Sequence, residues 1–115
     1  MNFKEFQEKT NQTALYPQEP AAVAMSYLTL GLCGESGEVA EIIKKMLRKG
    51  IPMSTLKDQA ADNQLRKQIK EELGDVLWYI GQLCEQCELS MEEIAKDNIR
   101  KLELRSKTNQ IQKID

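Results

Sequence analysis

Apolar residues recur every three or four positions along most of the chain, the spacing that predicts α-helices. No stretch shows the two-residue alternation of apolar and polar side chains that is typical of a half-buried β-strand. The fold class is therefore predicted to be all-α, a bundle of four helices. The predicted helices cover about residues 3–14, 21–49, 63–88 and 90–106.

Turn-forming residues mark several ends of these helices. A proline disfavours helical geometry in the residue before it, so Tyr16-Pro17 ends the first helix. Gly50 follows the second helix, where glycine commonly ends a helix. Ser90, with Glu93 three residues later, has the sequence of a capping box and begins the fourth helix.

The length of the chain, 115 residues, predicts one domain, because so short a chain rarely divides into two independent cores. We expect this domain to cover residues 1–106 and a C-terminal tail to cover residues 107–115. Residues 51–62 are predicted to be a polar loop.

The second predicted helix carries an acid within its apolar seam. At about 100° per residue, Glu35 lies about 20° from Leu28, in the middle of the seam. Glu38 lies about 80° from the same line, on the flank of the seam, and Glu41 points away from it. The apolar members of the seam are Leu28, Leu32, Val39, Ile42 and Met46.

The third predicted helix repeats this arrangement. Glu72 lies about 20° from Leu65 on the apolar seam, and Asp75 lies about 80° from it, on the flank. Glu71 points outward. The apolar members of this seam are Leu65, Ile69, Leu73, Val76, Ile80, Leu83 and Cys87.

If the two seams face each other, four carboxylates converge: Glu35, Glu38, Glu72 and Asp75. Two unit charges about 5 Å apart repel by roughly 3 kcal/mol at an effective dielectric constant of 20, so protons or cations must lie between them. Carboxylate ligands without Cys or His suit Mg²⁺ or Mn²⁺, which keep waters and bind substrate phosphates. The alternative is that these acids lie on the helix surface.

Glycines surround these acids. Gly31, Gly34 and Gly37 lie close to Glu35, and Gly74 lies within the second acidic pair. Each costs about 1 kcal/mol relative to alanine inside a helix. They either leave room for an ion, a water or a facing helix, or serve tight packing.

The composition excludes several kinds of active site. The chain contains no histidine, which removes Ser-His and Cys-His nucleophiles, zinc sites with imidazole ligands and Glu-x-x-His di-iron sites. The net charge of −2 argues against a nucleic-acid partner held by a basic surface. Neither a signal peptide nor a membrane span is predicted, so we expect a cytoplasmic protein with reduced cysteines. For Cys84 and Cys87, packing is favoured over a redox or zinc site.

The acidic motifs resemble those of a known family. Glu35-x-x-Glu38, followed by Glu72-x-x-Asp75 within Glu-Glu-Leu-Gly-Asp-Val-Leu-Trp-Tyr, is similar to the MazG-like all-α nucleoside triphosphate pyrophosphohydrolases, relatives of the dimeric dUTPases. The resemblance extends from the first helix to Arg105. Thirty-three residues separate Glu38 from Glu72, more than is usual for such proteins, and the extra length falls in the loop and the start of the third helix.

The resemblance implies a four-helix MazG-like bundle that assembles into dimers or tetramers. It also implies that the four acids hold the metal ion and that an Asn and a Lys of the fourth helix, Asn98 and Lys101, contact sugar and phosphates. Arg105 lies on the same stripe and is a further candidate for phosphate binding. A snorkelling Lys101 and a solvated Arg105 are the alternative.

Other residues are candidates for the nucleotide site. Lys45 shares the flank of Glu38 and could reach a phosphate, although a surface salt bridge is an equal alternative. Tyr79, one turn after Asp75, could stack on a base or sugar, or be a core aromatic. Base recognition is expected from the first helix, at Gln7 and Asn11.

Trp78 points away from the seam of the third helix. A lone tryptophan on an outer helix face predicts a covering surface, which we expect to be another subunit.

The sequence thus predicts a Mg²⁺-dependent enzyme, with Mn²⁺ as a possible substitute. It would convert a (deoxy)nucleoside triphosphate to the monophosphate and pyrophosphate, and its purpose would be to remove unwanted nucleotides or control the size of the nucleotide pool. Glu35 or Glu38 would orient or deprotonate the attacking water, and the expected partner is a second copy in a homodimer or homotetramer. The alternatives are a non-enzymatic helical interaction module, a phosphatase that releases orthophosphate and, less favoured, a di-iron bundle.

Overall fold

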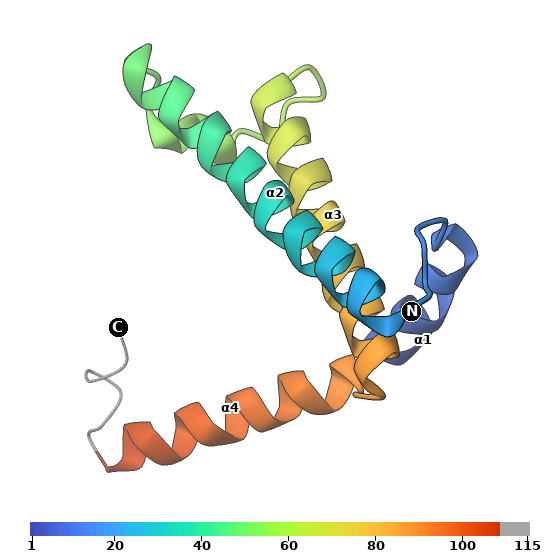
Figure 1. The fold of residues 1–115 in the computed structure, drawn as a ribbon. Helices are drawn as coiled ribbons and strands as arrows, with labels where there is room; N and C mark the ends of the chain where they lie inside the picture. Colours follow the sequence, from blue (N-terminus) through green and yellow to red (C-terminus); the bar gives the residue numbers. More distant parts are fainter. Residues whose placement is uncertain (109–115) are drawn as a thin grey trace.

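The computed structural model describes residues 1–108, and this part of the chain is all-helical (Figure 1). The structure confirms the predicted all-α class with four α-helices. The predicted tail, with Ile111 and Ile114, lies outside the described residues except for its first two positions. The helices are α1 (Phe3–Thr10), α2 (Ala21–Arg48), α3 (Gln64–Cys87) and α4 (Met91–Lys107), with short 3₁₀ turns η1 (Asn11–Thr13) and η2 (Met53–Lys57).

Helix α1 is shorter than its sequence suggests. In place of the last turn predicted for this helix, the chain forms the 3₁₀ turn η1. Side-chain hydrogen bonds at this point compete with the α-helix: the Thr10 hydroxyl donates to the Gln7 carbonyl at 2.6 Å, and the Asn11 side chain accepts from Gln82 of α3. At the other end, the side chain of Asn2 accepts from the Glu5 N–H and caps α1.

Helix α2 lies along α3, and this pair is the largest packing unit of the chain (Figure 1). Leu28 and Met46, members of the predicted seam, are fully buried near the two ends of α2. Gly50 adopts φ +68° after the last turn of α2, a conformation in which glycine has no steric cost. The two long helices thus pack against each other, but Leu73 and Cys87 of the predicted α3 seam are exposed.

Residues 51–62 contain η2, which packs on α3, so the predicted loop is partly helical. Asn63 caps α3 and also donates its side-chain N–H groups to the carbonyls of Thr55 and Asp58. Arg66 donates to the carbonyl of Leu56 at 2.7 Å. These bonds satisfy backbone carbonyls of the loop and hold it against the start of α3.

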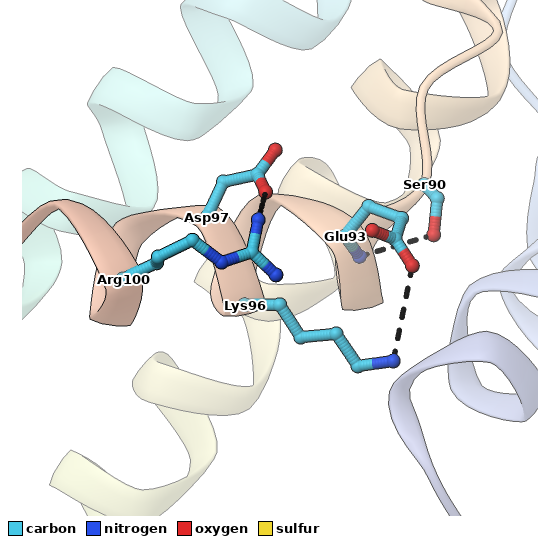
Figure 2. A network of polar contacts seen from close by, with 5 residues as sticks. All are labelled: Ser90, Glu93, Lys96, Asp97 and Arg100. Carbon is cyan, nitrogen blue, oxygen red and sulfur yellow. Dashed lines mark hydrogen bonds and ion pairs between the residues drawn. The ribbon is translucent and has the colours of Figure 1, made fainter.

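Helix α4 projects from the end of α3 as an arm, away from the α2–α3 pair (Figure 1). Ser90 Oγ accepts from the Glu93 N–H at 3.2 Å, which is half of the predicted capping box, whereas the Glu93 carboxylate pairs with Lys96 at 3.8 Å (Figure 2). Ile94 and Ile99 are 44% and 56% exposed. Within the described residues, the arm is packed at its start, where Met91 is buried and α4 contacts α1, and it exposes apolar side chains further along.

Candidate metal centre

Three of the four predicted acids meet between α2 and α3. One carboxylate oxygen from each of Glu35, Glu72 and Asp75 lies within 4.8 Å of the other two. Glu35 and Glu72 are half-buried on the facing seams, and Asp75 is exposed at the edge. We call these three residues the acidic trio. Its place is the one expected from the helical positions of the acids.

The electrostatics of the acidic trio are unfavourable without a cation. Proximity to the Glu72 carboxyl, burial and the charge of Asp75 raise the pKa of Glu35 from 4.5 to about 7. Burial and the charge of Glu72 also raise the pKa of Asp75. Oxygen Oε2 of Glu72 is buried, and no donor within residues 1–108 reaches it. A divalent cation fits these donors because it would satisfy the unpartnered oxygen and offset the repulsion.

Glu38 lies outside the acidic trio, although it was predicted with it. Its side chain is exposed, and its charge makes a smaller contribution to the raised pKa of Glu35. Glu41 behaves as an ordinary surface acid: it pairs with Lys44 at 3.0 Å, which lowers its pKa. Glu71 is also exposed, as its outward position predicts.

Tyr79 lies beside the acidic trio. Burial raises the pKa of its phenol, and the neighbouring Tyr27 hydroxyl and the Glu35 carboxylate add to this shift. Gly31 makes room for the ring, because a Cβ at this position would lie 2.1 Å from a ring carbon of Tyr79. Of the other glycines, Gly34 and Gly74 border open space.

Tyr27 is a residue that the sequence reasoning missed, whereas Gly31 was noted there without its neighbour, the ring of Tyr79. The spacing of Tyr27 and Gly31 from Glu35, at eight and four residues, places all three on one side of α2 and could have revealed Tyr27. The aromatic character of Tyr27 was a second available signal.

The predicted nucleotide-binding residues of α4 lie away from the acidic trio of the same chain. Asn98 and Lys101 are exposed and Arg105 is half-buried on the projecting arm (Figure 1). Another face of α4 carries short-range ion pairs, Glu93–Lys96 at 3.8 Å and Asp97–Arg100 at 3.2 Å (Figure 2). Lys45 is exposed on α2.

The candidate base-reading residues of α1 take part in a polar network with α3. The side chain of Gln7 donates to Glu85 Oε2 at 2.8 Å and to the Leu89 carbonyl at 2.9 Å, and it accepts from the Met91 N–H. Asn11 donates to Glu85 and accepts from Gln82. Both amide N–H groups of Gln7 are thus used within the chain, and its role here is structural.

The indole of Trp78 is half-buried by its own chain, so its position does not require a second subunit, and the subunit interface at this residue stays a prediction. Its Nε1–H donates to Thr13 Oγ1 at 2.7 Å, and its ring packs edge-on against Tyr16 and Tyr79. The segment after α1 folds back over this face of α3, a contact between distant parts of the sequence that helical periodicity does not reveal.

Cys84 is buried and Cys87 is exposed, and both are free thiols. Burial raises the pKa of the Cys84 thiol, which makes it less reactive. Within residues 1–108, the acidic trio is the one group of three or more Cys, Asp and Glu side chains close enough to hold an ion. Burial supports packing as the role of Cys84, whereas Cys87, which is exposed, is not explained by packing.

Over the same residues, no helix combines the length and the apolar character needed to cross a bilayer.

Comparison with known proteins places these observations in a family. The sequence model of the MazG nucleotide pyrophosphohydrolase domain matches residues 24–109. The chain is also 34% identical over 110 residues to the Gene 37 protein of Mycobacterium phage L5, an alignment that covers 93% of this chain and 90% of the phage protein. No solved structure matches the chain significantly.

Proposed function

The chain belongs to the MazG nucleotide pyrophosphohydrolase family, and we propose that it converts a (deoxy)nucleoside triphosphate to the monophosphate and pyrophosphate. The observation that carries this proposal is the acidic trio, with its unpartnered Glu72 oxygen and the raised pKa of Glu35. The biological purpose would be to remove unwanted nucleotides from the pool in the cytoplasm.

Glu35, Glu72 and Asp75 would hold Mg²⁺ or Mn²⁺, with Glu38 as a further ligand from the rim. A bound divalent ion supplies Lewis-acid stabilisation of the phosphate charge. Oxygen-only donors of this kind favour such hard cations.

Glu38 is the stronger candidate to orient or deprotonate the attacking water. It is exposed at the edge of the acidic trio, where its carboxylate can reach a water next to the phosphates. Glu35, with its pKa of about 7, is the second candidate, because a base in this range accepts a proton near neutral pH. Lys45, exposed on α2, would contribute a cationic group for the phosphates.

The α4 residues enter the site through a second copy of the chain. Asn98, Lys101 and Arg105 lie on an arm that leaves the α2–α3 pair, and the arm exposes apolar side chains beside them (Figure 1). The radius of gyration, 17.2 Å, exceeds the value of about 13 Å expected for a compact domain of this length. We therefore place the arm of one copy over the acidic trio of another, where its cations would stabilise the departing pyrophosphate.

The test of the reaction is a product assay. A panel of canonical and damaged nucleotides is incubated with Mg²⁺ or Mn²⁺, and pyrophosphate and orthophosphate are measured separately. We expect metal-dependent pyrophosphate release that EDTA abolishes. Orthophosphate as the only product would indicate a different phosphatase, and no product from any nucleotide would favour an interaction module.

The test of the shared site is complementation. Glu72→Gln and Lys101→Gln are each expected to be inactive. Mixed and allowed to exchange subunits, they should regain about a quarter of wild-type activity, because half of the dimers then contain one intact site of two. No recovery in a mixture that forms mixed dimers would place the arm and the acidic trio of one chain in the same site.

A further inference from the structure

Three residues form a row along one side of α2, each one turn after the last: Tyr27, Gly31 and Glu35. At 1.5 Å per residue, the row extends about 12 Å along the helix axis. The acidic trio lies at one end of this row and an aromatic ring lies at the other.

The ring of Tyr79 occupies the middle of the row. It lies directly against the α2 backbone at Gly31, where a Cβ would come within 2.1 Å of a ring carbon. Its ring centroid lies 6.4 Å from that of Tyr27, and its phenol is close enough to Glu35 for that charge to raise its pKa. Tyr79 therefore lies between Tyr27 and the acids.

The ring of Tyr27 is exposed but firmly supported. It stacks on Tyr16 with a centroid distance of 5.1 Å and an interplanar angle of 11°. Tyr16 is only 7% exposed, and its hydroxyl donates to Gln82 at 2.7 Å and accepts from Gln86 at 3.1 Å. Tyr27 nevertheless leaves 44% of its surface exposed, so part of its ring is open to a ligand.

We propose that Tyr27 is the stacking surface for the base of the nucleotide, so that the substrate lies along α2 with its base toward the N-terminal end of the helix. The phosphates then lie at the acidic trio, the sugar lies over Tyr79 and the base reaches Tyr27. This assignment rests on the proposed function and adds a direction of binding to it.

The physical basis is the affinity of aromatic rings for nucleobases. Every base has a π-face, so stacking favours nucleotides over bare phosphates without choosing strongly among bases. An exposed ring that is already fixed by Tyr16 loses little conformational entropy when a base covers it. Tyr27 should therefore contribute to substrate affinity and not to the chemical step.

The experiment compares Tyr27→Leu with Tyr27→Phe, which keeps the ring and removes only the hydroxyl. We expect KM for the nucleotide to rise roughly tenfold in the Leu variant, with kcat changed by less than about twofold, and to stay near wild type in the Phe variant. The inhibition constant of pyrophosphate, which has no base, should be the same in all three proteins.

An unchanged KM in a folded Leu variant would overturn the assignment. So would an equal weakening of pyrophosphate binding, since that would show a disturbed phosphate site. If the Leu variant fails to fold, the Tyr27→Trp variant is used as the test. Nucleotide should quench the fluorescence of the added tryptophan, and pyrophosphate should not. Absence of quenching by nucleotide would contradict the assignment.

The two proposals fail in different ways. Wild-type protein that neither binds nor hydrolyses any nucleotide would remove the proposed function, and this assignment with it. Turnover by the wild type, together with an unchanged KM in the Tyr27→Leu variant, would contradict the assignment of Tyr27 and leave the proposed function intact.

Discussion

Two polar regions lie on α3, one that faces α1 and one that faces α2, and they differ in how well their polar groups are satisfied. On the side that faces α1, Gln82 is 1% exposed, donates to Thr10 and Asn11, and accepts from Tyr16. On the side that faces α2, the buried Oε2 of Glu72 has no donor within the described part of the chain.

This difference distinguishes polar groups that stabilise the fold from polar groups that could bind a ligand. Buried polar groups that are fully hydrogen-bonded stabilise one arrangement of the helices, as the amide network does for α1. Carboxylates gathered without donors destabilise the fold until a ligand compensates for them. The α1–α3 network is therefore part of the architecture, and the acidic trio is the proposed site for a divalent cation.

The largest effect should follow the loss of a ligand. Glu72→Gln is expected to lower kcat/KM for nucleotide hydrolysis by at least about 100-fold, because the metal ion is no longer held. In metal-free buffer, the thermal midpoint should stay unchanged or rise, because repulsion with Glu35 and Asp75 is relieved.

The matched control for Glu72→Gln is Glu71→Gln, the exposed acid next to it. It removes the same charge from α3 without touching the acidic trio, so activity should stay near wild type. Equal losses in the two variants would show that net charge, and not the site, determines activity.

The amide network should show the opposite behaviour. Gln82→Met conserves volume but removes one hydrogen bond each from Tyr16, Thr10 and Asn11 in a buried place, so we expect the free energy of unfolding to fall by roughly 2 kcal/mol. Activity per folded molecule should be retained. Urea denaturation measures the first quantity and turnover measures the second.

Gln18→Met serves as the control for this prediction, because Gln18 is exposed and makes only a 3.4 Å bond to a backbone carbonyl. It should change stability by less than about 0.5 kcal/mol. A Gln82→Met protein that is as stable as this control would remove the structural role of the network.

A smaller effect is expected from pH in metal-free buffer. Glu35 has a folded-state pKa of about 7 against 4.5 in the unfolded chain, so the folded state binds this proton more tightly. The stabilisation is complete below pH 4.5 and is lost as the pH rises through 7, a change on the order of 1 kcal/mol after allowance for solvent exposure.

The pH effect is measured as the difference in unfolding free energy between wild type and Glu35→Gln, which removes contributions from other acids. The difference should change between pH 4.5 and 7, and saturating Mg²⁺ or Mn²⁺ at the upper end should stabilise wild type relative to Glu35→Gln. A pH-independent difference would mean that Glu35 is not perturbed by its neighbours.

The sequence predicted the helices and the facing acids because both follow from periodicity. Helix ends agree within a few residues where a cap or glycine marks them, as at Gly50 and Ser90. Glu35 and Glu72 could be placed together because each interrupts an apolar stripe. Their position needed only the pitch of a helix and the assumption that apolar stripes face each other.

The rest depended on contacts between distant segments. Periodicity gives the face on which Trp78 lies but not that η1 folds over it. It likewise gives the stripe of Asn98 on α4 but not the direction in which α4 leaves α3 (Figure 1). Turn geometry decides both, and a short connection such as Glu88 in the left-handed conformation has no strong sequence signal.

The most direct test of the account is calorimetric titration of the metal-free protein with Mn²⁺ and Mg²⁺ near pH 7.5, without nucleotide. We predict saturable binding to wild type and to Glu71→Gln, and its loss in Glu35→Gln and Glu72→Gln. Absence of binding to the wild type, or equal binding to all four proteins, would contradict the claim that the acidic trio is a divalent-cation site.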